Sequence, residues 1–172
     1  LLLVASREPL MTRTHTPTAP ADPRPRLDAD TLRAIAEGIA SADAAALLPA
    51  GANRRWALAA RTEVYEAWVI AWPAGTGLAM HDHDGSSAAI SVVDGRLRER
   101  YVDADSSVRV RWLGSGPATV LAGDHVHEVV NVGDREVVSV HVYSPPLADL
   151  SFRRDPELDL GAACALLLAA VD

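Results

Sequence analysis

The chain has 172 residues, of which 49% are hydrophobic and 23% are charged. This length and composition allow one well-packed core and are too small for two ordinary enzyme domains. The formal net charge of −7 and the isoelectric point near 5.3 argue against a protein that binds nucleic acid regardless of sequence, because such binding needs clustered basic side chains. We therefore expect a single acidic domain with no nucleic-acid partner.

The sequence predicts neither export nor a membrane anchor. The apolar residues 1–4 are followed closely by Arg7 and Glu8, whereas a secretory signal has an apolar core of about 7 to 15 residues. The longest other apolar run, residues 161–171, is shorter than the ~20 residues that cross a bilayer. We expect a cytoplasmic protein, with Met11 as a candidate translation start.

The N-terminal part predicts a lead-in and then a helical segment. The proline-rich stretch that ends at residue 26 cannot pack a core, so we expect residues 1–26 to be mobile and residues 27–172 to form one domain. Apolar residues then recur at helical spacing, with Asp28 or Asp30 available as the cap. One or two helices are expected within residues 28–48.

Beyond Arg61 the sequence changes to short runs of β-branched and aromatic residues separated by turn-forming residues. Seven runs have this character: residues 63–72, 88–93, 96–102, 108–113, 118–121, 128–132 and 136–143. No helical segment separates them, which is typical of an antiparallel sandwich or barrel. We expect an all-β domain whose barrel covers about residues 61–152, followed by a short helix that contains Cys164.

Three histidines in the barrel region indicate a metal site. His81 and His83 are one residue apart, so on a strand their side chains point to the same face. Imidazole suits Fe, Cu, Ni and Zn, and the later His127 lies where a barrel would bring a third ligand opposite the first two.

A second polar row follows near the end of the barrel region. Ser139, His141 and Tyr143 alternate with valines, so on a strand they share one face while the valines pack into the core on the other. The row is either part of an active site or a buried polar ladder that satisfies its own hydrogen bonds.

These motifs resemble those of the cupin superfamily. Its members are small antiparallel β-barrels with a metal ion at the mouth of the barrel. The motif residues are Gly75, His81, His83, Gly95, Gly123, His127 and Asn131. Within that superfamily, residues 68–147 resemble the cysteine dioxygenase family of thiol dioxygenases. The most specific part is the run Ser-Val-His-Val-Tyr-Ser-Pro-Pro, residues 139–146. The resemblance implies a cupin-type jelly-roll barrel.

The resemblance further implies that His81, His83 and His127 bind Fe(II), although Ni, Mn or Zn also suit such a site. The usual cupin carboxylate ligand falls on Ala88, which cannot bind metal. Three neutral imidazoles then leave the full charge of a divalent ion for an anionic thiolate. His125 could replace His127, but the spacing to the following asparagine favours His127 and makes His125 a turn or rim residue.

The resemblance also assigns roles around the metal. Tyr143, positioned through His141 and Ser139, would reach the substrate and oxygen as the catalytic row. The family's carboxylate-binding arginine lies upstream of the first long strand. Ungapped counting offers Arg55, while Arg61 lies nearer the strand.

A small gap would place Leu58 at the arginine position instead, so the substrate-binding residue stays open at this point. A guanidinium can hold a carboxylate by two parallel hydrogen bonds, and a surface role for either arginine is an equal alternative. The substrate is accordingly open among cysteine, 3-mercaptopropionate and a related small thiol.

The favoured hypothesis is a mononuclear Fe(II) thiol dioxygenase that converts a small thiol to its sulfinate with O2. Two alternatives are a metal-dependent cupin oxygenase or hydrolase of another small molecule, and a non-catalytic small-molecule-binding cupin. The Ser-His-Tyr row favours an enzyme, because a binding protein has no evident use for it.

Overall fold

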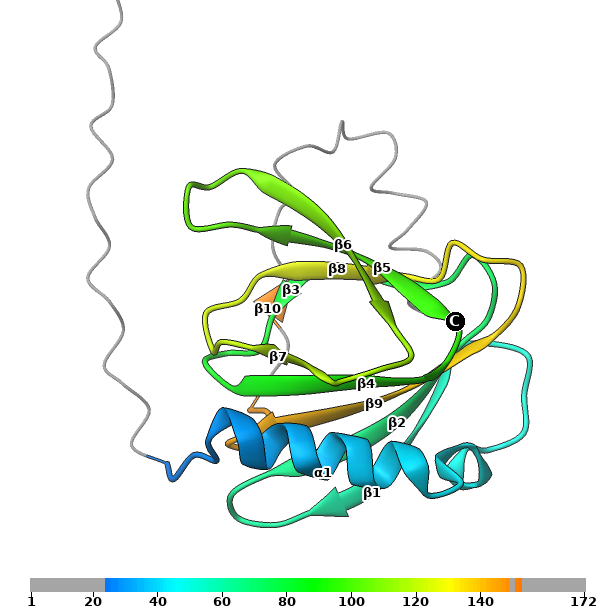
Figure 1. Cartoon of the computed structure of the whole chain (residues 1–172), viewed down its shortest axis with the longest axis horizontal. Helices are drawn as coiled ribbons and strands as arrows, with labels where there is room; N and C mark the ends of the chain where they lie inside the picture. Colours follow the sequence, from blue (N-terminus) through cyan, green and yellow to red (C-terminus); the bar gives the residue numbers. More distant parts are fainter. Residues whose placement is uncertain (1–23, 149–150, 153–172) are drawn as a thin grey trace, which may run out of the picture.

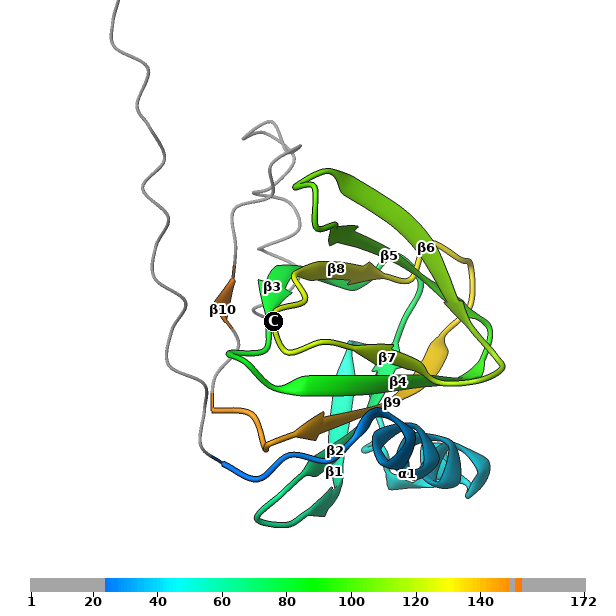
Figure 2. The same ribbon diagram turned by 60° about the vertical axis from the view of Figure 1, so that its left-hand side comes forward.

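Two five-stranded antiparallel sheets face each other in the computed structural model, which describes residues 24–148 and 151–152. One helix covers the outer face of one sheet (Figure 1) and keeps that position in the turned view of Figure 2. The expected all-β antiparallel architecture with a helical N-terminal segment is confirmed. Most of the expected lead-in, and the expected helix containing Cys164, lie outside the described residues.

The helical segment consists of α1 (Ala29–Ser41) and the 3-10 turn η1 (Ala44–Leu47). Asp28 caps α1, because its carboxylate accepts a hydrogen bond of 2.8 Å from the Thr31 backbone N–H. Asp30 lies inside the first turn instead. Within the described part of the chain no helix is long and apolar enough to cross a bilayer, and the expected cytoplasmic location stays a prediction.

The first sheet has the strand order β1–β2–β9–β4–β7, and the second has the order β10–β3–β8–β5–β6. The strands are β1 (Arg55–Arg61), β2 (Glu66–Trp72), β3 (Gly77–Asp82), β4 (Ser87–Asp94), β5 (Arg96–Val102), β6 (Val108–Gly114), β7 (Thr119–Leu121), β8 (His127–Val130), β9 (Val137–Ser144) and β10 (Ser151–Phe152).

Three of these strands, β1, β3 and β10, lie outside the seven expected runs. β1 and β3 contain no β-branched residue, so their composition does not predict strands. Their pairing with β2 and β8 makes them extended. Sheet formation here depends on neighbours more than on local propensity.

Two hydrophobic clusters lie on opposite faces of the first sheet. One lies between the sheets and includes Trp72, Ile90, Leu97, Leu113, Leu121 and Val129. The other lies under α1 and includes Leu32, Ala36, Val69, Val140 and Val142. Val138, Val140 and Val142 of β9 thus pack under the helix, as the alternation predicts, and the intervening polar row faces the space between the sheets.

The segment that precedes α1 is held by hydrogen bonds to two loops, one after β3 and one after β9. Arg24 donates to the carbonyl of Pro146 at 2.8 Å, and Arg26 donates to that of Gly85 at 2.6 Å.

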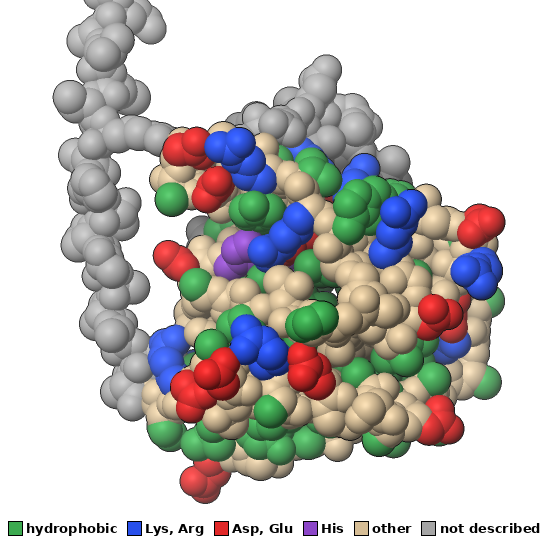
Figure 3. All heavy atoms as spheres, in the orientation of Figure 1, with side chains coloured by type: hydrophobic (Ala, Val, Ile, Leu, Met, Phe, Trp, Pro, Cys, Tyr) green, Lys and Arg blue, Asp and Glu red, His purple; other side chains and the backbone are tan. Residues whose placement is uncertain are grey.

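Acidic and basic side chains are interspersed on the face drawn in Figure 3.

Replacing Leu32 with alanine tests the contribution of the cluster under α1. Leu32 is 1% exposed, so its truncation should lower the free energy of unfolding by about 2–5 kcal/mol, measured by urea denaturation. Leu47→Ala is the control, because Leu47 is 50% exposed and should contribute about 0.5 kcal/mol or less. Equal losses in the two variants would contradict a core beneath the helix.

Candidate metal centre and substrate pocket

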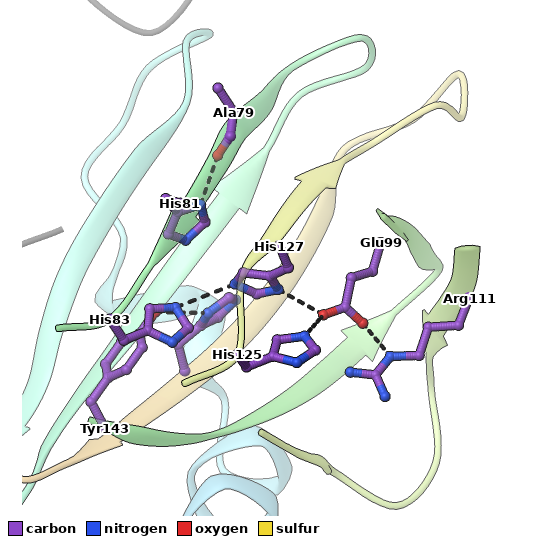
Figure 4. A network of polar contacts seen from close by, with 9 residues as sticks. Ala79, His81, His83, Glu99, Arg111, His125, His127 and Tyr143 are labelled. Atoms are coloured by element: carbon purple, nitrogen blue, oxygen red, sulfur yellow. Dashed lines mark hydrogen bonds and ion pairs between the residues drawn. The ribbon is translucent and has the colours of Figure 1, made fainter. Parts of the chain in front are cut away.

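Three imidazoles meet between the sheets (Figure 4). His81 lies on β3, His83 directly follows that strand, and His127 is the first residue of β8. β3 and β8 are antiparallel neighbours in which His81 pairs with His127. Gly77 permits their close approach, because a Cβ atom there would lie 2.7 Å from the carbonyl oxygen of Val129. The two histidine motifs are therefore brought together by backbone pairing.

One ring nitrogen from each of the three histidines lies within 4.8 Å of the other two, and all three residues are buried. His81 Nδ1 lies 2.7 Å from the Ala79 carbonyl oxygen, to which it must donate. Its Nε2 therefore carries the lone pair. His127 Nε2 faces His83 Nε2 at 3.3 Å. This arrangement can hold a metal ion.

The donor set fits a divalent metal that prefers nitrogen ligands. Burial and then the neighbouring imidazoles lower the pKa of His81 to about 3 and that of His83 to about 2, so both rings are neutral at pH 7. His83 Nδ1 is buried without a hydrogen-bond partner in the described structure. His81 and His127 donate from Nδ1 and therefore carry lone pairs on Nε2, and a cation between them and His83 would use one nitrogen of each ring as a ligand.

Glu99 on β5 is a site residue that the sequence analysis missed. It is fully buried and accepts hydrogen bonds from His127 Nδ1 at 2.7 Å and His125 Nε2 at 2.9 Å, and it contacts Arg111 Nε. Burial alone would raise the pKa of Glu99, but these hydrogen bonds hold it below its usual range. A carboxylate behind a histidine fixes the ring and makes it a better metal ligand.

The alternation of inward-facing and outward-facing residues along β5 could have identified Glu99 from the sequence. Leu97 and Glu99 are both fully buried, whereas Arg98 and Arg100 lie on the opposite face and ion-pair with Glu128. A lone acidic residue on the inward face of a strand needs a partner. In this barrel the partners are His127 and the half-buried His125, which the sequence analysis assigned to the rim.

The second polar row is hydrogen-bonded along its whole length. Ser139 Oγ lies 2.9 Å from His141 Nε2, and His141 Nδ1 lies 3.1 Å from the Tyr143 hydroxyl. Trp72 Nε1 donates to Ser139 Oγ at 2.8 Å. The ring centroids of Tyr143 and His83 are 5.0 Å apart, so the row ends beside the histidine cluster.

A pocket of about 540 Å³ opens on the other side of Tyr143. Its apolar walls come from Trp56, Trp68, Ile70, Trp72, Leu78 and Leu147, and its polar groups from Arg54, Arg61, Glu66 and Tyr143. Trp68 and Trp72 belong both to the packing between the sheets and to the wall of this pocket. Tyr143 is the residue that belongs to both the pocket and the surroundings of the cluster.

The structure gives the nearby arginines different surroundings. Arg55 forms a two-point ion pair with Glu136, at 2.8 and 2.9 Å, and is not part of the pocket wall. Arg61 lines the pocket and ion-pairs with Glu66 at 3.4 Å. Neither arginine is therefore an unengaged cation at the pocket.

Arg54, which the sequence analysis did not consider, lies in the pocket wall. It donates to the Gly77 carbonyl at 2.6 Å and lies over the rings of Trp56 and Trp72, at 5.8 and 5.6 Å from their centroids. Among residues 24–148, no carboxylate lies within ion-pairing distance of it.

The difference of one residue between Arg54 and Arg55 follows from strand alternation. Trp56 pairs with Ile70 of the pocket wall, so the residue two positions earlier shares its face. Arg55 points to the opposite side, where it meets Glu136. The ungapped counting that offered Arg55 does not determine which face a side chain takes, because one inserted residue reverses it.

Comparison with known proteins shows that one family model matches most of the described residues. The sequence model of the family described as Cysteine dioxygenase type I matches residues 27–154. No curated protein sequence matches the chain significantly.

Solved structures share the fold at low sequence identity. A Thermus thermophilus protein is 18% identical with a TM-score of 0.52, over 60% of this chain and 95% of that one. A Klebsiella pneumoniae protein with a double-stranded β-helix domain is 19% identical with a TM-score of 0.52, over 62% and 90%. A Bacillus subtilis oxalate decarboxylase mutant is 16% identical with a TM-score of 0.52, over 60% of this chain and 29% of that one. These structures support the barrel fold alone.

Replacing Glu99 with glutamine should weaken metal binding. Glutamine keeps the shape but removes the charge behind His127, and loss of such a partner lowers metal affinity by about 10- to 100-fold. Titration of the full chain with Co(II) by calorimetry measures this loss. Glu128→Gln is the matched control, because Glu128 is equally buried but pairs with arginines on the opposite face. Similar affinities for the Glu99 variant and the unmodified protein would refute the role of Glu99.

Proposed function

This chain belongs to the cysteine dioxygenase type I family of cupins, and we propose that it is an Fe(II)-dependent dioxygenase of a small thiol. The reaction adds both oxygen atoms of O2 to the thiol sulfur and gives the sulfinate. The observation that carries the proposal is the cluster of three neutral, buried imidazoles beside the hydrogen-bonded Ser-His-Tyr row.

The ligand set explains why a thiol is the favoured substrate. Ala88, at the usual cupin carboxylate position, is fully buried on β4 and pairs with Tyr143, and it offers no ligand atom. His81, His83 and His127 are neutral ligands, so the whole 2+ charge of the ion is available to attract an anionic thiolate. Iron bound there would supply the redox chemistry that joins sulfur and dioxygen.

The pocket supplies the rest of substrate recognition. Arg54 would bind a substrate carboxylate, because it is the pocket guanidinium without an acidic partner in the described structure. The Arg61–Glu66 pair leaves little net charge at the other polar part of the wall. The tryptophan walls would give the substrate an apolar surface, and Tyr143 would join the pocket to the metal centre, because it lines the pocket and its ring centroid lies 5.0 Å from that of His83.

Oxygen consumption with a panel of small thiols tests the activity. Fe(II)-loaded protein should consume O2 only with a thiol and should release the corresponding sulfinate, detected by mass spectrometry. His127→Ala should lose bound iron and turnover together, because the cluster loses a ligand. Oxygen uptake without sulfinate, or turnover of a non-thiol substrate alone, would instead support an oxygenase or hydrolase of another small molecule.

Arg54→Ala tests carboxylate recognition. Loss of a charged hydrogen bond of about 1.5–3 kcal/mol should raise KM for 3-mercaptopropionate by roughly 10- to 100-fold. KM for cysteamine, which has no carboxylate, should change little. Arg55→Ala is the control, because Arg55 pairs with Glu136 away from the pocket. If Arg55→Ala raised KM and Arg54→Ala did not, the assignment of Arg54 would be wrong.

A further inference from the structure

We propose that Trp72 is a positioning residue that fixes the direction of the hydrogen bonds along Ser139, His141 and Tyr143. In that direction Tyr143 accepts from His141 and presents its own hydroxyl hydrogen to the pocket. The catalytic consequence rests on the proposed function, but the direction itself can be measured in the absence of any activity.

The direction begins at the indole of Trp72. Its Nε1–H is a donor and never an acceptor, and it lies 2.8 Å from Ser139 Oγ. Trp72 is 1% exposed and Ser139 is fully buried, so this contact is shielded from solvent. Ser139 Oγ therefore accepts from Trp72, and its hydroxyl hydrogen is left for a second partner.

The second partner of Ser139 in the described structure is His141 Nε2, at 2.9 Å. If His141 donated to Ser139, the serine hydroxyl hydrogen would be buried without an acceptor, which is the most unfavourable state for a polar group. Ser139 must therefore donate, and His141 Nε2 must accept.

The acceptor role of Nε2 determines the other nitrogen of His141. Burial lowers the pKa of His141 to about 3, so the ring is neutral and carries one N–H. That hydrogen lies on Nδ1 and is donated to the Tyr143 hydroxyl oxygen at 3.1 Å. Because the Tyr143 oxygen accepts this hydrogen bond, its own hydroxyl hydrogen is left for another partner, and Tyr143 is one of the residues that line the pocket.

The direction matters because it sets the sign of the polar group at the reacting atoms. A fixed O–H donor stabilises negative charge on a thiolate or on developing oxygen anions. With the opposite direction, Tyr143 would donate back to His141 and present lone pairs, which repel such charge. Besides lining the pocket, Trp72 thus acts on Tyr143 through two intermediate residues, Ser139 and His141.

Nitrogen-15 NMR of the histidine rings tests the direction. The full chain, labelled on histidine and loaded with diamagnetic Zn(II), should show His141 as the Nδ1–H tautomer, with signals assigned by their loss in His141→Gln. In Trp72→Phe, Ser139 loses its donor, so the Nε2–H tautomer should become a major form. Trp68→Phe is the matched control, because Trp68 is on the same strand and pocket wall but its N–H donates to Glu66 at 3.0 Å. It should leave the tautomer unchanged.

An Nε2–H tautomer in the unmodified protein would overturn the inference, and so would an unchanged tautomer in a folded Trp72→Phe protein. The tautomer of the unmodified protein can be measured without any variant, so this test remains possible even if Trp72→Phe does not fold. In the thiol assay, Trp72→Phe should lower kcat by about tenfold or more and should add little to the loss caused by Tyr143→Phe. Absence of thiol turnover would contradict the proposed function and leave the NMR result standing.

Discussion

The antiparallel pairing of β3 with β8 is the constraint on which the site depends. It places His81 opposite His127, although the two residues are far apart in the sequence, and His83 completes the set from the next inward position. A slip of one residue between these strands would turn the ring of His81 away from the cluster. The backbone hydrogen bonds of an ordinary sheet therefore bring the candidate ligand rings together without any metal.

The strand β9 joins this centre to the rest of the molecule. Three of its valines, Val138, Val140 and Val142, pack under α1, while Ser139, His141 and Tyr143 point between the sheets. Since one strand contributes to both layers, the helix that covers the sheet also holds the polar row in register. Glu99 gives similar support from β5, where it links His127 and His125 to Arg111. His127 and Ser139 are thus each held by a partner from a different strand, Glu99 and Trp72 respectively.

Sequence patterns predicted those parts of the site in which residue spacing alone places the side chains on one face of a strand. His-x-His and Ser-x-His-x-Tyr place side chains on one face of any strand, so the composition of the two rows follows without a structure. Arg54 and Glu99 were not predicted, because their roles depend on strand register and on which residue meets them across the barrel. β1 and β3 were not among the expected runs, because they contain no β-branched residue and are extended through pairing with neighbouring strands, although the His-x-His motif was interpreted on a strand.

The position of Arg54 over two indole rings determines how strongly added salt weakens anion binding there. Its guanidinium is half-buried and lies over the rings of Trp56 and Trp72, so dissolved counterions approach it from few directions. Charges in such surroundings are screened much less than charges in open water. An anion held there would consequently stay bound in concentrated electrolyte, where a pair on the open surface, such as Arg109 with Asp105, contributes almost nothing.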